Sequence, residues 1–183
     1  MNKFLAIIIL ILLFPVFFII SVFIILDDGR PIFFTQKRVG IDNSFFRMYK
    51  FRSMKTNTPN IATDLLENPK QYVLKVGIAL RKLSLDELPN LLNIIKGDMV
   101  FVGPRPSLYN QDDLIQLRTA AGIDKLKPGL TGWAQVNGRD KITLEEKVAL
   151  DKIYLENRSL MFDIKIFFRT FSLAFLKQKG INH

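Results

Sequence analysis

The uncharged run FLAIIILILLFPVFFIISVFIIL, from Phe4 to Leu26, limits the possible folds of this chain more than any other feature. About 20 consecutive apolar residues suffice to span the hydrocarbon core of a bilayer. We therefore expect residues 1–26 to form a membrane-embedded helical segment. A cleaved signal peptide is disfavoured, because the run is long and is followed by ILDDGRP rather than by a small-residue cleavage site.

Pro15 lies near the middle of this run, where it removes a backbone hydrogen bond and clashes with the preceding turn. A kink is expected there. A kinked helix that crosses the membrane and a re-entrant hairpin that returns to the same side both fit these residues. The basic residues Arg30, Lys37, Arg38 and Arg47 follow the run, and the positive-inside rule places them in the cytoplasm in either geometry.

Composition narrows what the rest of the chain, residues 27–183, can do. Its length suits one compact domain. The chain has no cysteine and its only histidine is His183, which excludes thiol catalysis, disulfides and an internal imidazole base. The 26 Lys and Arg against 17 Asp and Glu give a net charge of +9, which favours anionic partners. No nucleic-acid-binding motif is recognisable, so nucleic acid is not an expected partner.

Local patterns predict an α+β domain that is mainly helical. Two short strands, in PIFFTQKRV and FFRMYKFRSM, flank the turn-prone GIDNS and should form a hairpin. Helices are predicted over 72–83, 84–95, 107–121 and 141–158. A mobile loop over a site is predicted at 55–70, and a structured loop at 122–139. A short strand in DMVFVGPRP should deliver Arg105 in a rigid turn.

The segment FDIKIFFRTFSLAFL, from Phe162 to Leu176, has the pattern of an amphipathic helix. Phe167, Phe168, Phe171 and Phe175 recur at helical spacing, with Lys and Arg residues between and after them. Such a helix can lie in the headgroup layer with its aromatic face towards the membrane. An ordinary helix that packs this face against the core fits the same pattern.

The octapeptide SLDELPNL at 84–91 places two carboxylates, Asp86 and Glu87, side by side. Ser84 followed three residues later by Glu87 is a capping-box pattern, which would put both acids in the first turn of a helix. The alternative is a nucleophile and a Mg²⁺ site for phosphate chemistry, because a carboxylate can open a diphosphate by forming an acyl phosphate.

Attack of a carboxylate on a diphosphate requires cations that neutralise the repulsion between the two anions. Arg105 in GPRP and Arg139 in NGR lie in turns rich in Gly and Pro, where backbone amides can also approach phosphate oxygens. Lys50, Arg52 and Arg81 are further candidates for substrate binding. These three residues could equally form a basic surface next to a membrane, with no role in substrate binding.

Five motifs follow one another along the chain: KFRSM at 50–54, LSLDELPNLLNIIKGDM at 83–99, VGPRP at 102–106, KPGLTGWAQVNGRD at 127–140, and Asp151, Tyr154, Asn157, Ser159 and Asp163. Taken together, they resemble the monotopic phosphoglycosyl transferases, the bacterial initiating sugar-phosphate transferases of glycan assembly. The resemblance covers nearly the whole chain and corresponds to the small catalytic-core form of that family.

The resemblance implies transfer of a sugar 1-phosphate from a UDP-sugar to a polyprenyl phosphate, usually undecaprenyl phosphate, with release of UMP. It implies a covalent phosphosugar on Asp86, with Glu87 as its partner and Mg²⁺ held by this pair. By the same matching, Lys50, Arg105, Arg139 and Asp163 line the site.

The resemblance also implies a re-entrant helix at the bacterial inner membrane, with the catalytic domain on the cytoplasmic face. The family breaks this helix at a Ser-Pro pair, where the serine can bond the backbone freed by proline. This chain has Phe14 and Pro15 at that place, and phenylalanine cannot form such a bond. The chain also begins at MNKF, without the basic, aspartate-containing stretch that usually precedes the helix in the family.

A non-enzymatic alternative is a membrane-anchored basic module that binds anionic lipid or a partner protein. It accounts for the charge and for the apolar run, and it treats SLDELPNL as a capped helix. It gives no role to the combination of GPRP, NGR and the acidic pair, so the enzyme is the favoured hypothesis.

Overall fold

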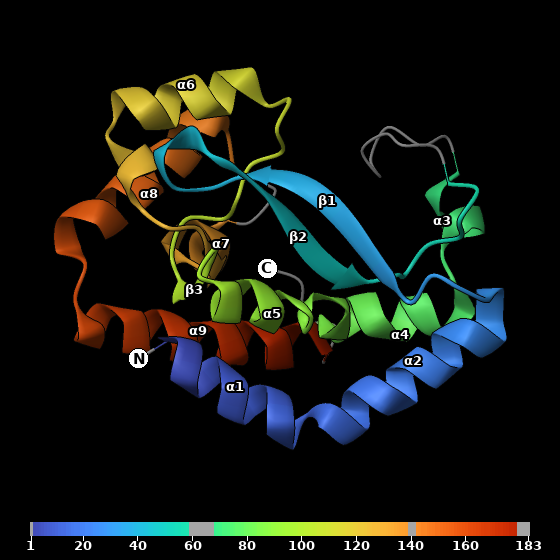
Figure 1. Cartoon of the computed structure of the whole chain (residues 1–183). Helices are drawn as coiled ribbons and strands as arrows, with labels where there is room; N and C mark the ends of the chain where they lie inside the picture. Colours follow the sequence, from blue (N-terminus) through green and yellow to red (C-terminus); the bar gives the residue numbers. More distant parts are fainter. Residues whose placement is uncertain (1, 59–67, 139–141, 179–183) are drawn as a thin grey trace.

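The computed structural model describes residues 2–58, 68–138 and 142–178 (Figure 1). In chain order the first elements are α1 (Asn2–Leu12), α2 (Phe14–Asp28), β1 (Phe33–Val39), β2 (Phe45–Phe51), α3 (Pro69–Tyr72), α4 (Lys75–Lys82), a 3-10 turn (Leu85–Glu87) and α5 (Asn90–Lys96). They are followed by β3 (Val100–Val102), α6 (Asp112–Ala120), β4 (Gly129–Thr131), α7 (Trp133–Asn137), α8 (Leu144–Asn157) and α9 (Leu160–Gln178). The predicted α+β class with mainly helical content is confirmed.

The N-terminal segment is a bent pair of helices. α1 and α2 meet at Leu13 with an angle of 62° between them, and Pro15 lies in the first turn of α2. Proline is tolerated there, because the first turn of a helix does not use its N–H groups. The predicted kink is confirmed. No single helix within the described ranges is long and apolar enough to cross a membrane, whereas α1 and α2 together have the length and composition of a span.

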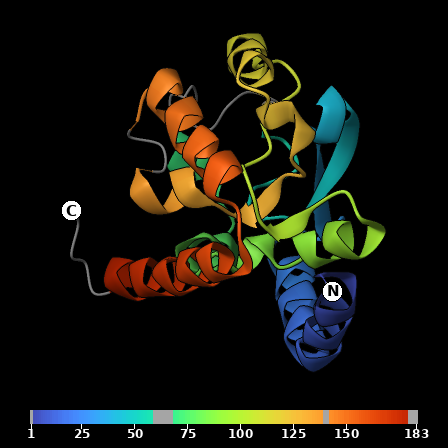
Figure 2. The same cartoon turned by 90° about the vertical axis from the view of Figure 1, so that its left-hand side faces the viewer.

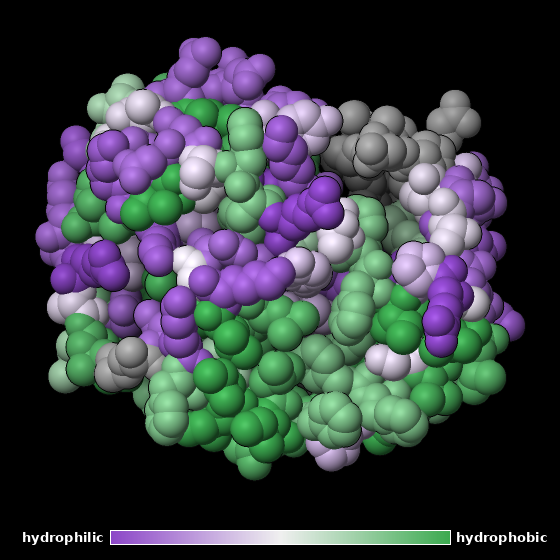
Figure 3. Space-filling model, in the orientation of Figure 1, coloured by the Kyte–Doolittle hydropathy of each residue, from purple (hydrophilic) through white to green (hydrophobic). Residues whose placement is uncertain are grey.

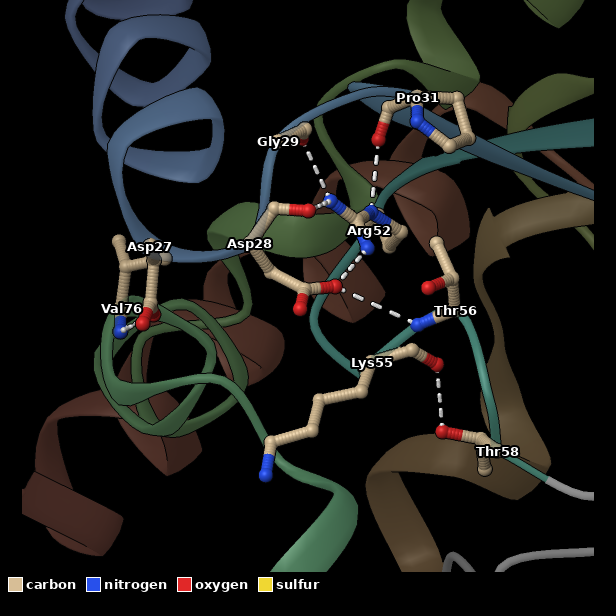
Figure 4. Close-up of polar contacts among 9 residues, drawn as sticks. All are labelled: Asp27, Asp28, Gly29, Pro31, Arg52, Lys55, Thr56, Thr58 and Val76. Carbon is tan, nitrogen blue, oxygen red and sulfur yellow. Dashed lines mark hydrogen bonds and ion pairs between the residues drawn. The ribbon is translucent and has the colours of Figure 1, made fainter.

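Both ends of the bent pair contact the remainder of the chain. At the start of α1, Lys3 Nζ lies 3.4 Å from the Lys96 carbonyl oxygen, and Ala6 is buried against α5. At the end of α2, the Asp27 carboxylate accepts a hydrogen bond of 3.0 Å from the Val76 amide at the start of α4 (Figure 4). The two ends therefore lie on the same side of the bend, which in Figure 1 forms a V beneath α9, α5 and α4.

Most of the surface of α1 and α2 is apolar and exposed. Leu12 and Leu26 are 72% and 76% exposed, and Phe4, Phe14 and Phe18 are exposed to a similar extent. Figure 3 shows this hydrophobic surface over the lower part of the molecule, whereas hydrophilic residues dominate the upper part. So large a contiguous apolar surface is unusual on a protein surrounded only by water.

The predicted hairpin forms, with β1 and β2 antiparallel and Phe34 opposite Lys50. Side chains alternate between the two faces of a strand, so Arg38 and Lys50 share one face of the hairpin. Asn93 of α5 fixes this hairpin to the core. Its buried amide accepts from the Tyr49 N–H at 3.0 Å and donates to the Arg47 carbonyl at 2.7 Å.

A second small sheet pairs β3 with β4 in parallel. It brings the GPRP turn after β3 against the KPGLTG segment, and two glycines make this contact possible. A Cβ on Gly129 would lie 2.1 Å from the Gly103 backbone nitrogen, which is closer than any side chain allows. The two backbones can approach this closely only because neither position carries a side chain.

The single helix predicted over 84–95 is wrong, and so is its capping box. Ser84 has a left-handed backbone conformation (φ +55°), and its side chain caps no helix. The segment instead forms the 3-10 turn Leu85–Glu87, and α5 begins only after Pro89. Tertiary contacts override the local signal, because the Glu87 side chain bonds to two cations rather than to the backbone of Ser84.

Two other predicted helices form with shifted boundaries, whereas a predicted loop contains regular elements. The helix expected over 107–121 is α6, which begins at Asp112, and the loop at 122–139 contains β4 and α7. The helix over 141–158 is α8, whose first turn carries a complete capping box formed by Thr143 and Glu146. Most of the loop predicted at 55–70 lies outside the described residues.

The C-terminal helix α9 has both a core-facing side and an exposed apolar side. Ile166 is fully buried, and Phe162 packs on Trp133. Three phenylalanines of α9 are exposed, as an interfacial helix requires: Phe167, Phe168 and Phe171. The structure does not describe the side chain of Phe175. Each of the two interpretations of this pattern thus describes one side of the same helix.

Candidate active site

Glu87 is the centre of a cluster of charged side chains from three distant parts of the chain. Its Oε1 accepts from Lys50 Nζ at 2.9 Å and from Arg105 Nη2 at 3.2 Å. Burial alone would raise the pKa of Glu87, but the positive charges of Lys50 and Arg105 outweigh it and lower the pKa to about 2. Glu87 is therefore ionised throughout the physiological range and holds the two cations in place.

Asp86 is adjacent to Glu87 in a contrasting environment. Its carboxylate forms no ion pair with any residue of the described ranges. Burial raises the pKa of Asp86, the nearby Lys50 opposes this shift, the Glu87 charge adds to it, and Arg81 at the end of α4 opposes it. Two neighbouring carboxylates thus have pKa values displaced in opposite directions, a pattern typical of catalytic sites. A carboxylate that is less stabilised as an anion is also the more basic nucleophile.

Arg38 of β1 belongs to the same cluster, although its sequence context marks it only as part of a basic flank. Its Nη1 donates to the Pro106 carbonyl at 2.9 Å, next to Arg105. Burial, followed by the charge of Arg105, lowers the pKa of Arg38 to about 10. Strand alternation could have found it, since hairpin pairing places Arg38 on the face that carries Lys50. The three cations Arg38, Lys50 and Arg105 outnumber the carboxylates of Asp86 and Glu87. The cluster therefore has an excess of positive charge that an anionic ligand could balance.

The GPRP turn that carries Arg105 is held through four consecutive carbonyl groups. Each accepts a hydrogen bond from a different donor: Pro104 from the Gly129 N–H at 2.9 Å, Arg105 from Arg118 Nη1 at 2.8 Å, Pro106 from Arg38 Nη1 at 2.9 Å, and Ser107 from the Val39 N–H at 3.1 Å. The rigidity predicted for this turn thus comes from β1, α6 and β4 as much as from its own prolines.

Arg118 can hold the Arg105 carbonyl because it forms a buried ion pair of its own. Its Nε and Nη2 donate to the same Asp151 oxygen at 3.0 and 2.6 Å. Asp151 is 1% exposed and Arg118 is 8% exposed. Burial raises the pKa of Asp151, and the charge and hydrogen bonds of Arg118 oppose this shift. The pair joins α6 to α8 behind the turn.

Replacing Asp151 by Asn is expected to destabilise the protein by about 3 kcal/mol, because it leaves the Arg118 charge buried without a counter-charge. For a chain of this size, that loss lowers the melting temperature by roughly 10 °C, which thermal unfolding in detergent measures. The matched control is Asp113→Asn, at an exposed position in the first turn of α6. Equal melting temperatures for the two variants would contradict the role assigned to the pair.

Arg52 and Asp163 form contacts of their own outside the ion pairs of Glu87. Arg52 is 4% exposed and holds the end of α2, where its guanidinium donates to the Asp28 carboxylate and to the carbonyls of Asp28, Gly29 and Pro31 (Figure 4). Asp163 on α9 lies 2.8 Å from the Tyr154 hydroxyl, with which it shares a hydrogen bond. Arg139 lies outside the described residues. Substrate binding by these three stays a prediction, and the contacts of Arg52 give it a structural role at the base of the N-terminal helices.

The predicted Mg²⁺ can be tested against the donors present. Mg²⁺ in proteins is commonly held by one or two carboxylates together with substrate phosphates, and its remaining positions are filled by water. Asp86 fits, since a cation would compensate a half-buried carboxylate that has no ion pair within the described ranges. Glu87 fits less simply, because two cations already share its Oε1. No cluster of three acidic or histidine ligands exists among the described residues, so substrate oxygens would have to complete the coordination.

The acidic pair, the cations around Glu87 and the bent apolar helices are features that the resemblance to sugar-phosphate transferases implies. The sequence model for bacterial sugar transferases matches residues 1–177, almost the entire chain. The chain belongs to the bacterial sugar transferase family. The resemblance drawn from the motifs is thereby confirmed at the level of a phosphoglycosyl transferase family.

The chain is also similar in sequence to individual bacterial proteins. The chain is 46% identical to the uncharacterized sugar transferase EpsL of Bacillus subtilis, over 143 residues that cover 77% of this chain and 68% of EpsL. It is 39% identical to the exopolysaccharide production protein ExoY of Sinorhizobium fredii, over 90% of this chain and 79% of ExoY. It is 38% identical to the UDP-glucose:undecaprenyl-phosphate glucose-1-phosphate transferase of Escherichia coli, over 95% of this chain but only 39% of that longer protein.

Proposed function

We propose that this protein is a phosphoglycosyl transferase that moves a sugar 1-phosphate from a UDP-sugar to a polyprenyl phosphate at the bacterial inner membrane, with release of UMP. The observation that carries the proposal is the geometry at Glu87, which gathers Lys50 and Arg105 beside the carboxylate of Asp86. Membership of the family supports the reaction class, and the E. coli relative carries the same type of reaction in its name.

In the proposed first step, a carboxylate oxygen of Asp86 attacks the phosphorus atom that bears the sugar. The bond from that phosphorus to the bridging oxygen breaks, and UMP leaves with the electron pair. Lys50, Arg105 and Arg38 belong to the cluster around Glu87, next to Asp86 in the chain, and their positive charges would lower the repulsion between the two anions. The product is an acyl phosphate that joins Asp86 to the sugar.

In the second step, an oxygen of the polyprenyl phosphate attacks the same phosphorus atom. The bond to Asp86 breaks, the carboxylate is regenerated, and the sugar leaves on a polyprenyl diphosphate. Glu87 keeps the cations in place during both steps, since its lowered pKa leaves it ionised. A Mg²⁺ held by Asp86 and the substrate phosphates would supply further charge neutralisation.

The same proposal places α1 and α2 in the membrane as a re-entrant pair. Three observations support it: the exposed apolar surface of the pair, the bend of 62°, and the contacts that both ends make with one domain. Arg30, Lys37 and Arg47 then lie at the cytoplasmic surface, where the positive-inside rule favours them. The lipid acceptor and the soluble donor can meet at this surface.

The experiment that tests the proposal is release of UMP by the detergent-solubilised protein, supplied with Mg²⁺, undecaprenyl phosphate and each member of a panel of UDP-sugars. Intact-protein mass spectrometry on a sample without acceptor tests the covalent step. Release that depends on the lipid, together with a sugar-phosphate adduct on Asp86, is the expected result.

Two other outcomes change the proposal. Lipid-dependent release without an adduct would retain the enzyme and remove the covalent route. No release with any donor, from protein shown to be folded, would contradict the enzyme and favour the membrane-anchored basic module.

A further inference from the structure

An open groove of about 680 Å³ is lined by residues of α7, α8 and α9, and none of the residues of the Glu87 cluster lines it. Figure 2 shows the side of the molecule where α8 turns into α9. Most of the groove lining is apolar, with Trp133 from α7, Ile153 from α8, and Met161, Phe162 and Ile164 from α9. Met161 is 75% exposed, and Ile153 and Ile164 are each 41% exposed. The groove thus offers a long apolar ligand a surface that the protein itself leaves uncovered.

Two cations lie at the tryptophan of this groove. Lys165 Nζ is 5.5 Å from the centre of the Trp133 ring, and the guanidinium carbon of Arg169 is 5.4 Å from it. The two residues are one helical turn apart on α9, so they present their charges together. Neither forms an ion pair with any residue of the described ranges. An apolar groove with two uncompensated positive charges at one place is complementary to an amphiphile with an anionic head.

The groove continues into the exposed apolar side of α9. Ile164 belongs to both, and Phe167, Phe168 and Phe171 extend the exposed surface along the helix. The exposed phenylalanines of α9 favour a position on the same membrane surface as α1 and α2, and in that position the groove opens at the level of the lipid headgroups. Lys and Arg side chains near such a surface attract anionic lipids.

We propose that this groove binds one anionic phospholipid of the surrounding bilayer, with the lipid phosphate between Lys165 and Arg169 and an acyl chain along Trp133 and Phe162. This inference rests on the membrane placement in the proposed function. The reacting acceptor lipid is a different ligand, because its phosphate must reach Asp86. The groove shares no residue with the cluster around Glu87, and no described hydrogen bond joins the two sets of side chains.

Trp133 is the only tryptophan of the chain, so its fluorescence reports on this groove alone. The test places the protein in phosphatidylcholine vesicles that contain a small fraction of phosphatidylglycerol brominated on its acyl chains, since bromine quenches tryptophan at short range. A parallel sample carries the same fraction of brominated phosphatidylcholine. We expect the brominated anionic lipid to quench Trp133 severalfold more than the brominated zwitterionic lipid does.

Variants then identify the headgroup site. The double variant Lys165→Gln/Arg169→Gln is expected to lower quenching by the anionic lipid to the level of the zwitterionic one. The matched control Lys125→Gln/Lys152→Gln removes two charges from exposed lysines of other elements and should leave the difference unchanged. Equal quenching by the two lipids, or a difference that survives in the Lys165/Arg169 variant, would overturn the inference.

A competition arm separates the two lipid sources. Unbrominated undecaprenyl phosphate should not relieve the quenching, and relief at a low fraction would mean that the groove binds the acceptor and not a phospholipid. The measurement needs no turnover, so selective quenching in a protein that releases no UMP would refute the proposed reaction alone. Failure of the protein to associate with the vesicles would refute both the membrane placement and the lipid site.

Discussion

Replacing Asp86 by Asn is expected to reduce lipid-dependent UMP release by a factor on the order of 10³ or more, because an amide cannot form the acyl phosphate. The fold should survive. Asp86 forms no ion pair within the described ranges, and burial raises its pKa. The folded state therefore does not stabilise the negative charge of Asp86, and a neutral amide at this position should not destabilise the fold. The measurement is steady-state UMP release, with the melting temperature as the check on folding.

The variant needs a control that changes the same chemical group elsewhere. Asp112→Asn is suitable, since this residue is exposed in the first turn of α6. Its activity should stay close to that of the unchanged protein. Asp86→Asn protein that is folded and retains full activity would refute the assignment of Asp86 as nucleophile, and Glu87 would then be the next carboxylate to test.

Replacing Gly129 by Ala is expected to have the largest effect on stability, with a loss of more than about 4 kcal/mol or no folded protein at all. The new Cβ would lie 2.1 Å from the Gly103 nitrogen and 2.6 Å from the Gly103 oxygen. Both are backbone atoms of the segment that leads into the Arg105 turn. No side-chain rotation relieves such a contact, so β3 and β4 would have to separate. Thermal unfolding and the yield of folded protein measure the effect.

Gly122→Ala is the matched control. A Cβ at that position meets only Leu155 Cδ2, at 4.0 Å, and the cost comes from its positive φ of +74°. That cost is about 1 kcal/mol. If Gly129→Ala and Gly122→Ala destabilised the protein equally, the close approach of the two backbones would not be what holds the turn.

Several elements could be predicted because their signals are local. Two strands around GIDNS, the helix over 141–158 and the kink near Pro15 depend on residues close in sequence, and all three are present. The octapeptide SLDELPNL shows where local signals fail. Its residues have the pattern of a capping box, but no capping box forms. The Glu87 carboxylate forms ion pairs with Lys50 and Arg105 instead of bonding to the backbone of Ser84. Contacts between charges over such sequence distances are not visible in a local window.

The candidate site divides in the same way. Asp86 and Glu87 are adjacent in sequence, and GPRP marks Arg105 as rigidly placed, so these residues could be identified directly. No short sequence motif marks Arg38 or Arg118 as part of the site. The role of each depends on the carbonyl group to which its guanidinium donates. Arg38 donates to the Pro106 carbonyl and Arg118 to the Arg105 carbonyl, and both hydrogen bonds form only when the chain has folded. Arg52 illustrates the converse, since a basic residue in a recognisable motif forms structural contacts at the end of α2.

The sequence by itself determined the apolar N-terminal segment, the α+β class, the acidic pair and the resemblance to a family, because each depends on residue type and short-range spacing. Only the tertiary structure decided that Lys50, Glu87 and Arg105 meet, that both ends of the bent helices contact one domain, and that Trp133 faces an open groove with two cations. The physical reason is range. Propensity and periodicity act within a few turns of chain, whereas buried charge pairs and close backbone contacts join segments that the sequence separates by tens of residues.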